Sequence, residues 1–302
     1  MNKNRFKKKK ATIKKKSIFT ILLIIALALA IIFSRAYRSY QRIPDADIHQ
    51  KEHTVNHVQE EKAEQEKSDE IMQENHLPTT NILLGKHSRQ ERDSLLTLVH
   101  SGYGNREGLY MHKEAYEAFK KMHAAASEGG VQLTIISAFR SFDHQKRIWE
   151  NKWNGVQSLH GNINATSIID PSKRAKEVLR FSAMPGTSRH HWGTDIDINS
   201  LDNNYFREGK GKLEYEWLSE NASYYGFCQP YTVLGQRDNQ GYEEEKWHWS
   251  FIPVARLYLE IFADSVDYEH IRGFDGWQTA QELDVINNYV LAIDAGCKKH
   301  FQ

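Results

Sequence analysis

Sixteen consecutive residues near the start of the chain, residues 18–33, carry no charge and no strongly polar group. As a helix this stretch would be about 24 Å long, at about 1.5 Å per residue, and its flanking residues would extend it toward the ~30 Å of a bilayer core. A buried helix of a soluble core is a poor alternative, because the stretch is apolar on every face. The sequence therefore predicts a transmembrane segment at residues 17–34.

The preceding residues, 1–16, contain nine Lys and Arg side chains and no acidic one. Basic residues before an apolar segment keep its N-terminal end in the cytoplasm. We therefore expect a cytoplasmic tail at residues 1–16 and an uncleaved signal-anchor, with all later residues outside the membrane. A cleaved secretory signal, cut near residues 34–36, is the alternative.

The formal net charge of +1 comes from 40 basic and 39 acidic residues. Without the tail, the chain keeps 31 basic and 39 acidic groups, a net charge of −8. An acidic body gives no electrostatic reason to bind nucleic acid, so we expect no such partner. The oligomeric state stays open.

Residues 35–80 are rich in Glu, Gln, Lys and His and lack the apolar residues of a core, so they predict a stalk or linker. Residues 81–302 have the pattern of apolar residues that is typical of a folded domain. Hydrophobic periodicity predicts an α+β fold with helices packed on a small antiparallel sheet. The expected helices are residues 110–130, 142–153 and 277–297, the expected strands are 131–137, 194–198 and 247–252, and residues 154–182 read as a surface insertion.

Two short segments concentrate side chains that can do chemistry. Residues 188–197, SRHHWGTDID, place imidazoles on a tight turn and carboxylates on the strand that follows. Residues 245–249, EKWHW, place a carboxylate three residues before a histidine. Two His and one Asp suffice for a zinc site with an open fourth position, and a nearby Glu could act as general base.

The same segments resemble the VanY-type D-alanyl-D-alanine carboxypeptidases, zinc peptidases of the bacterial cell wall with the Hedgehog/DD-peptidase fold. SRHHWGTDID matches S-x-H-x-x-G-x-A-x-D, and EKWH matches E-x-W-H. Residues 137–141, SAFRS, followed by Gln145, are similar to a third motif, and PGTS at 185–188 and YGF at 225–227 extend the likeness. The resemblance covers roughly residues 110–252.

The resemblance implies a role for each matching residue. Zinc would be bound by His190, Asp197 and His248. Glu245 would be the general base and acid, and Arg140 would stabilise the oxyanion. The expected substrate-binding residues are Ser188, Gln145 and, from its place between base and ligand, Trp247.

The sequence leaves three points open. The family usually has a small residue where this chain has Asp195, which either orients a ligand or receives a substrate ammonium, or is a solvated acid at the strand end. His191 competes with His190 as a ligand, although the family spacing selects His190. Cys228 and Cys297 are compatible with one disulfide or with two buried thiols.

The basic tail and the apolar segment, taken together with the resemblance, predict a single-pass enzyme of the bacterial cell membrane, with its catalytic domain on the extracytoplasmic side. Its expected activity is zinc-dependent D,D-carboxypeptidase cleavage, which removes the terminal D-Ala from peptidoglycan stem peptides. An L,D-carboxypeptidase that trims tetrapeptide stems is the nearest alternative. A non-catalytic wall-binding module that keeps the zinc fold is a more distant one.

Overall fold

The structure is a computed structural model that describes residues 31–32, 34–35, 38, 77–235, 237 and 241–298. The predicted tail at 1–16 and most of the predicted anchor (17–34) and stalk (35–80) lie outside these residues. Among the described residues, no helix has the length and apolarity needed to cross a bilayer. Nearly all described residues belong to one unit, residues 78–302.

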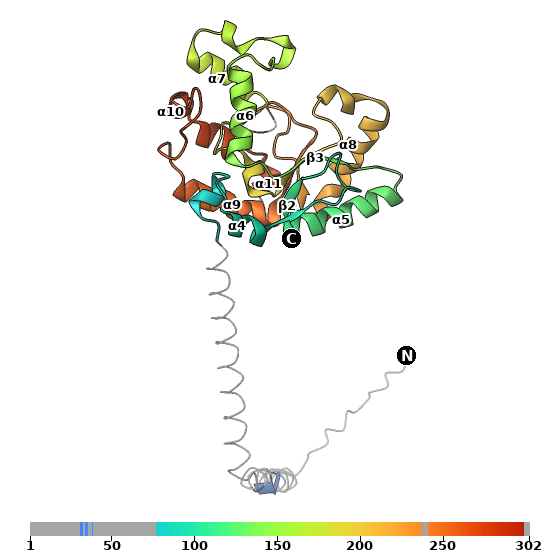
Figure 1. Cartoon of the computed structure of the whole chain (residues 1–302). Helices are drawn as coiled ribbons and strands as arrows, with labels where there is room; N and C mark the ends of the chain where they lie inside the picture. Colours follow the sequence, from blue (N-terminus) through green and yellow to red (C-terminus); the bar gives the residue numbers. More distant parts are fainter. Residues whose placement is uncertain are drawn as a thin grey trace, which may run out of the picture. The chain divides into compact units, whose positions relative to one another are not determined.

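A four-stranded antiparallel sheet lies at the centre of this unit (Figure 1), with strand order β3-β4-β6-β5. Its strands are β3 (Ile135–Ser137), β4 (Asp195–Ile198), β5 (Phe227–Cys228) and β6 (His248–Phe251). A separate two-stranded antiparallel sheet joins β1 (Leu96–Leu98) to β2 (Tyr110–His112). The predicted class, helices packed on a small antiparallel sheet, is confirmed.

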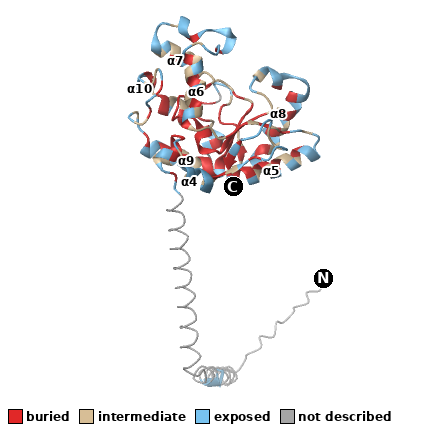
Figure 2. Ribbon diagram, viewed as in Figure 1, coloured by how far each residue is buried: buried red, intermediate tan, exposed pale blue. Residues whose placement is uncertain are grey.

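Helices surround the central sheet, and the buried residues gather in the sheet and on the inner faces of the helices (Figure 2). Helix α5 buries Ala115, Phe119, Met122 and Ala126, a three- and four-residue spacing that places them on one face. The α-helices are α3 (Thr80–Leu83), α4 (Arg89–Leu95), α5 (Lys113–Glu128), α6 (Phe142–Trp153), α7 (Pro171–Leu179), α8 (Gly209–Asn221), α9 (Ile252–Ser265), α10 (Thr279–Glu282) and α11 (Ala295–Lys298).

A short 3₁₀ helix, η3 (Arg189–Trp192), leads into β4 through Gly193. Gly193 has a φ of 72°, a conformation that side chains with a Cβ rarely adopt. A Cβ at this position would also lie 2.9 Å from the backbone nitrogen of His112. Glycine therefore allows the sharp turn that brings η3 next to the strand.

The expected single helix at residues 277–297 is wrong. The segment forms α10, a π-helical turn (Ile286–Val290) and α11. Asp284 breaks it, because its φ of 46° is left-handed and cannot continue a right-handed helix. The Asp284 carboxylate accepts hydrogen bonds from the Tyr268 hydroxyl and the Asn287 amide, which stabilise the break.

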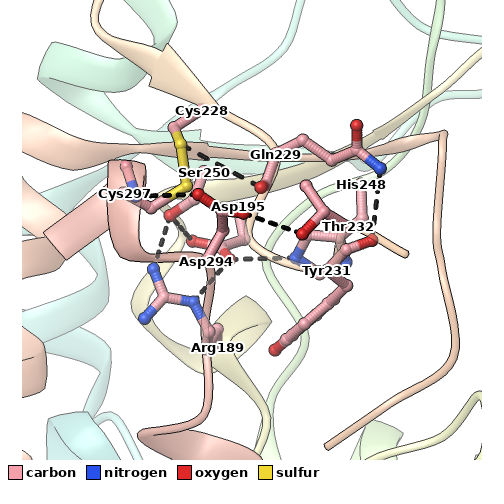
Figure 3. Close-up of a disulfide and its surroundings, with 11 residues drawn as sticks. Arg189, Asp195, Cys228, Gln229, Tyr231, Thr232, His248, Ser250, Asp294 and Cys297 are labelled. Carbon is pink, nitrogen blue, oxygen red and sulfur yellow. Dashed lines mark hydrogen bonds and ion pairs between the residues drawn. A yellow bond between two sulfur atoms is a disulfide. The ribbon is translucent and has the colours of Figure 1, made fainter. Parts of the chain in front are cut away.

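Cys228 and Cys297 form a disulfide that joins β5 to α11 (Figure 3). The bond closes a sequence separation of 69 residues, for which chain entropy predicts about 4 kcal/mol of stabilisation. The Asp294 N–H also donates to the Pro230 carbonyl at 2.9 Å. The disulfide and this hydrogen bond fix the C-terminal segment against the loop that carries Tyr231. The ring centroids of Tyr231 and His248 lie 4.7 Å apart.

Candidate active site

The register between β4 and β6 brings the predicted ligands together. Asp197 lies directly opposite His248, and Asp195 lies opposite Ser250. Because side chains alternate across a strand, all four lie on one face of the sheet. These four residues are buried, so the face they share is shielded from bulk water.

His190 reaches the same place from η3, where the Arg140 N–H donates to its carbonyl at 3.0 Å. Its Nδ1 lies 2.8 Å from the Ala138 carbonyl, an acceptor, so Nδ1 carries the proton. The lone pair of Nε2 then faces Asp197 Oδ1 at 3.3 Å. Burial, with the Arg140 guanidinium close by, lowers the pKa of His190 and favours the neutral ring that a metal requires.

Whereas His190 faces Asp197 through Nε2, His248 points its Nδ1 into the site. Nδ1 lies 3.4 Å from Asp197 Oδ1 and 3.1 Å from Glu245 Oε2, while Nε2 lies 2.9 Å from Asp195 Oδ2. Burial alone would lower the pKa of His248, but the hydrogen bonds to the Asp195 and Glu245 carboxylates outweigh it and raise the pKa to about 9. A metal ion would take the place of the proton on Nδ1.

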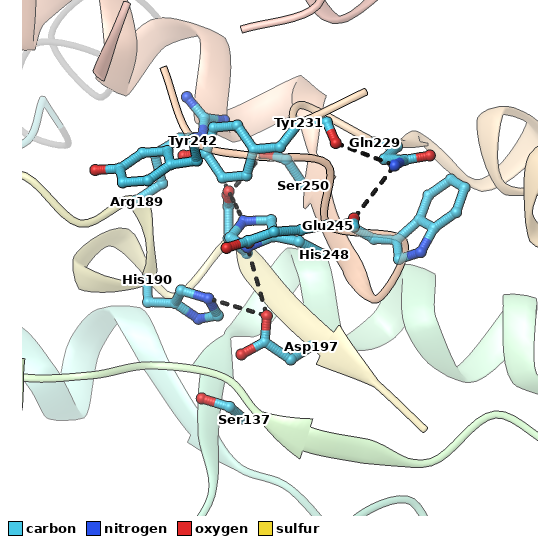
Figure 4. A network of polar contacts seen from close by, with 12 residues as sticks. Ser137, Arg189, His190, Asp197, Gln229, Tyr231, Tyr242, Glu245, His248 and Ser250 are labelled. Atoms are coloured by element: carbon cyan, nitrogen blue, oxygen red, sulfur yellow. Dashed lines mark hydrogen bonds and ion pairs between the residues drawn. The ribbon is translucent and has the colours of Figure 1, made fainter. Parts of the chain in front are cut away.

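The three predicted ligands fit a metal ion. Donor atoms of His190, Asp197 and His248 all lie within 4.8 Å of one another, and all three residues are buried (Figure 4). Asp197 Oδ1 is buried, and no hydrogen bond from the described residues satisfies it. A buried acceptor without a donor is costly, and a cation between the two imidazoles would remove that cost.

His191 is not placed to be a ligand. Its Nε2 accepts from the Gly186 N–H at 3.0 Å, and its Nδ1 therefore donates to the Arg140 carbonyl, 2.6 Å away. Both ring nitrogens are occupied by backbone groups. Burial lowers the pKa of His191 to about 3, so the ring stays neutral and holds the turn before η3 against the segment after β3.

Glu245 lies in the turn before β6, where the Tyr231 carbonyl and the Gln229 amide bind its backbone. Its carboxylate faces His248 Nδ1, beside the metal ligands. Burial raises the pKa of Glu245 above its ordinary value, which suits a group that must accept and then release a proton.

Arg140 pairs with Asp197 Oδ2 and donates to Ser137 Oγ at 2.8 Å. Gln145 lies behind Arg140, where its Oε1 is 3.4 Å from the guanidinium and its Nε2 donates to the Ala183 carbonyl. In the structure, Arg140 therefore also holds a predicted ligand. Its role toward an oxyanion, and that of Gln145 toward substrate, remain predictions.

A cavity of about 440 Å³ opens beside this centre. The predicted metal ligands, Glu245, Arg140, Ser188 and Trp247 all line it, whereas Gln145 does not. Phe181 and Trp247 contribute aromatic rings 6.3 Å apart to its wall. A cavity of this size next to the ligands leaves room for a peptide end.

A buried network around Asp195 was not expected in full from the sequence. Asp195 accepts from Arg189 Nε at 2.9 Å, from Ser250 Oγ at 2.7 Å and from Thr194 Oγ1 at 2.9 Å, besides its contact with His248 Nε2. Burial opposes ionisation, but Arg189 and the hydrogen bond to His248 hold the pKa of Asp195 well below its ordinary value. Of the readings left open, the structure supports a carboxylate that orients a ligand histidine.

Replacing Asp195 with Asn is expected to weaken metal binding by about 10–100-fold, the usual cost of losing such an outer partner. The neutral amide would no longer hold His248 with Nε2 protonated and Nδ1 free. Competition with a chromophoric chelator measures this affinity. The exposed Asp264 of α9, changed to Asn, is the control. Equal metal affinity in Asp195→Asn and the control would contradict the orienting role.

Comparison with known proteins places these features in a family. Residues 108–254 match the family model described as "VanY: D-alanyl-D-alanine carboxypeptidase". "Putative carboxypeptidase YodJ" of Bacillus subtilis is 34% identical over 145 residues, 47% of this chain and 46% of that protein. A D-alanyl-D-alanine carboxypeptidase of Enterococcus faecalis is 28% identical over 130 residues, 43% and 44% of the two chains. The alignments thus span less than half the length of these curated relatives.

Solved structures give more distant matches. VanYB in complex with D-Alanine-D-Alanine aligns with a TM-score of 0.40 and 21% identity, over 57% of this chain and 89% of that one. The LdcB LD-carboxypeptidase aligns with a TM-score of 0.42 and 23% identity, over 69% and 78%. The matched segment 108–254 contains the three predicted metal ligands and Glu245. Through this segment, the chain belongs to the VanY family of D-alanyl-D-alanine carboxypeptidases.

Proposed function

We propose that this chain is a zinc-dependent D,D-carboxypeptidase that removes the terminal D-Ala from peptidoglycan stem peptides. The observation that carries the proposal is the convergence of His190, Asp197 and His248 beside Glu245 at the wall of an open cavity. Two histidines and one carboxylate are a typical ligand set of catalytic zinc, with a position left for water. A non-catalytic wall-binding module would have no need of the complete set.

When bound, zinc would polarise the scissile carbonyl and lower the pKa of a coordinated water. The Glu245 carboxylate is placed to take a proton from the attacking water and to deliver it to the leaving amine. Arg140 holds Asp197 and offers guanidinium donors at the cavity wall, where charge develops on the carbonyl oxygen. No covalent acyl-enzyme is needed, so Ser188 is not expected to act as a nucleophile.

We also propose that the catalytic unit works on the outer side of a bacterial membrane, held there by the apolar segment at 17–34. The support is the nine-cation tail before an uncharged stretch. Fusing a reporter enzyme that folds only outside the cytoplasm to the C-terminus tests this orientation. Reporter activity confined to the cytoplasm would contradict it.

Purified residues 41–302 are expected to release D-Ala from a pentapeptide stem, and a chelator should stop the release until Zn²⁺ is restored. Chromatographic detection of free D-Ala is the measurement, with tetrapeptide stem as the parallel substrate. Release from the tetrapeptide alone would move the assignment to the L,D class. No release from either peptide by the zinc-loaded protein would contradict carboxypeptidase activity.

A further inference from the structure

A lysine in the cavity wall has no counterpart among the predicted site residues. Lys152 lies in the last turn of α6 and lines the same cavity as Glu245 and His248. Its ammonium donates to Ser182 Oγ at 2.5 Å, and Ser182 is itself buried and lines the cavity. The two side chains therefore present a cation and a hydroxyl to one part of the cavity.

Lys152 has no carboxylate within ion-pairing distance among the described residues. Burial lowers the pKa of its ammonium, while the Glu245 carboxylate raises it and the Arg140 guanidinium lowers it. Lys152 therefore interacts electrostatically with both Glu245 and Arg140, although it forms no ion pair with an acidic side chain among the described residues. An ammonium in this position would gain from an anion that enters with the substrate.

The other cations of the cavity are less suited to bind such an anion. Arg140 is paired with Asp197, and Arg189 with Asp195. Burial lowers the pKa of His144, which favours its neutral form, and Arg106 is exposed to solvent. The acids of the cavity wall, Asp197 and Glu245, are arranged around the metal position. Among the described residues that line the cavity, Lys152 is therefore the partly buried cation without an acidic partner.

We propose that Lys152 and Ser182 form a carboxylate-binding subsite for the peptide substrate. The inference rests on the proposed function and adds how the substrate is recognised. A carboxypeptidase substrate carries a carboxylate one residue beyond the scissile carbonyl, about 3.5 Å of extended chain away. The Lys152 ammonium and the Ser182 hydroxyl together offer the donors that bind both oxygens of a carboxylate. A side-chain carboxylate elsewhere in the peptide has the same chemistry and is the second possible source.

Peptide binding, measured by calorimetry on the zinc-loaded Glu245→Gln protein, tests the subsite without turnover. The probes are diacetyl-L-Lys-D-Ala-D-Ala, its C-terminal amide, and a pentapeptide stem with its side-chain carboxylate either free or amidated. Lys152→Met should weaken binding of the carboxylate-bearing probes by about 10–100-fold, as for a truncated charge pair. Lys152→Arg should restore part of the loss. Arg147→Met, which removes an exposed cation from the same helix, is the matched control.

The pattern across the probes identifies the carboxylate. A loss that disappears with the C-terminal amide assigns the subsite to the terminal carboxylate. A loss that is absent with both tripeptide probes, and that appears only with the pentapeptide whose side-chain carboxylate is free, assigns it to the side chain. An equal loss for every probe, or no loss for any, overturns the subsite.

Turnover separates this inference from the proposed function. The Glu245-intact enzyme should show the Lys152→Met effect mainly in KM, with kcat and metal affinity nearly unchanged. D-Ala release with an unchanged KM in Lys152→Met would overturn the subsite alone. Carboxylate-dependent binding without any D-Ala release would overturn the proposed function alone. Absence of binding to every probe by the parent protein would overturn both.

Discussion

Glu245→Gln is expected to lower kcat by about 10²–10⁴-fold, the contribution of a well-placed general acid–base group, while the metal stays bound. The amide has nearly the same shape, but it cannot accept the proton of the attacking water. The carboxylate lies 3.1 Å from His248 Nδ1, so it belongs to the surroundings of the metal without being one of the three convergent donors. Single-turnover D-Ala release, together with zinc content by mass spectrometry, separates the chemistry from metal loading.

The matched control for this variant is Glu243→Gln, two residues earlier in the same turn. Glu243 forms a partly exposed ion pair with Arg180, and such pairs contribute only about 0–1 kcal/mol to stability. Its loss should leave both kcat and zinc content unchanged. Full turnover in Glu245→Gln would contradict the role of this carboxylate, and loss of zinc would instead make Glu245 part of the metal site.

Local sequence patterns were sufficient to predict the elements that carry the ligands. The expected helix at 142–153 coincides with α6, and the expected strands at 194–198 and 247–252 contain β4 and β6. Alternation of polar and apolar residues was visible in the sequence at 194–198. The register of its pairing with the other strand matters, because a shift of one residue moves every side chain to the opposite face. The pairing of one strand with the other was not visible, since it depends on contacts between residues some 50 positions apart.

Several features of the site were not predicted, because the register between β4 and β6 could not be read from the sequence. Without it, Ser250 could not be placed opposite Asp195, and Arg189 could not be recognised as the buried partner of that carboxylate. The polar residues at alternating positions of both strands were the signal that such a network existed. Lys152 was missed for a similar reason, because it joins the cavity through the end of a helix and not through a motif.

The predicted C-terminal helix failed for a different reason. Its apolar spacing is real, since Leu283, Ile286, Val290 and Ile293 are all buried. Periodicity reports which residues face the core, but it does not report whether the backbone between them stays helical. The left-handed Asp284 and its hydrogen-bond partners interrupt the helix while the apolar residues still reach the core.

His190→Ala is expected to weaken zinc binding by more than the 10–100-fold caused by loss of an outer partner, and to reduce turnover to background. The substitution removes one of the three donor atoms that would bind the metal. The ion that would satisfy the buried Asp197 Oδ1 is then held less tightly. Chelator competition gives the affinity, and D-Ala release gives the activity. The neighbouring His191 provides a control one residue away in the same 3₁₀ helix.

His191→Ala should behave differently, because this imidazole binds two backbone groups and no metal. Its loss leaves the Gly186 N–H and the Arg140 carbonyl without their partner, at a cost of about 1–3 kcal/mol for each buried group. We therefore expect a lower melting temperature with zinc still bound, and His191→Asn serves if the alanine variant does not fold. Retention of zinc by His190→Ala, with its loss from a folded His191 variant, would exchange the two assignments. The spacing of seven residues between His190 and Asp197 would then no longer identify the ligand in this chain.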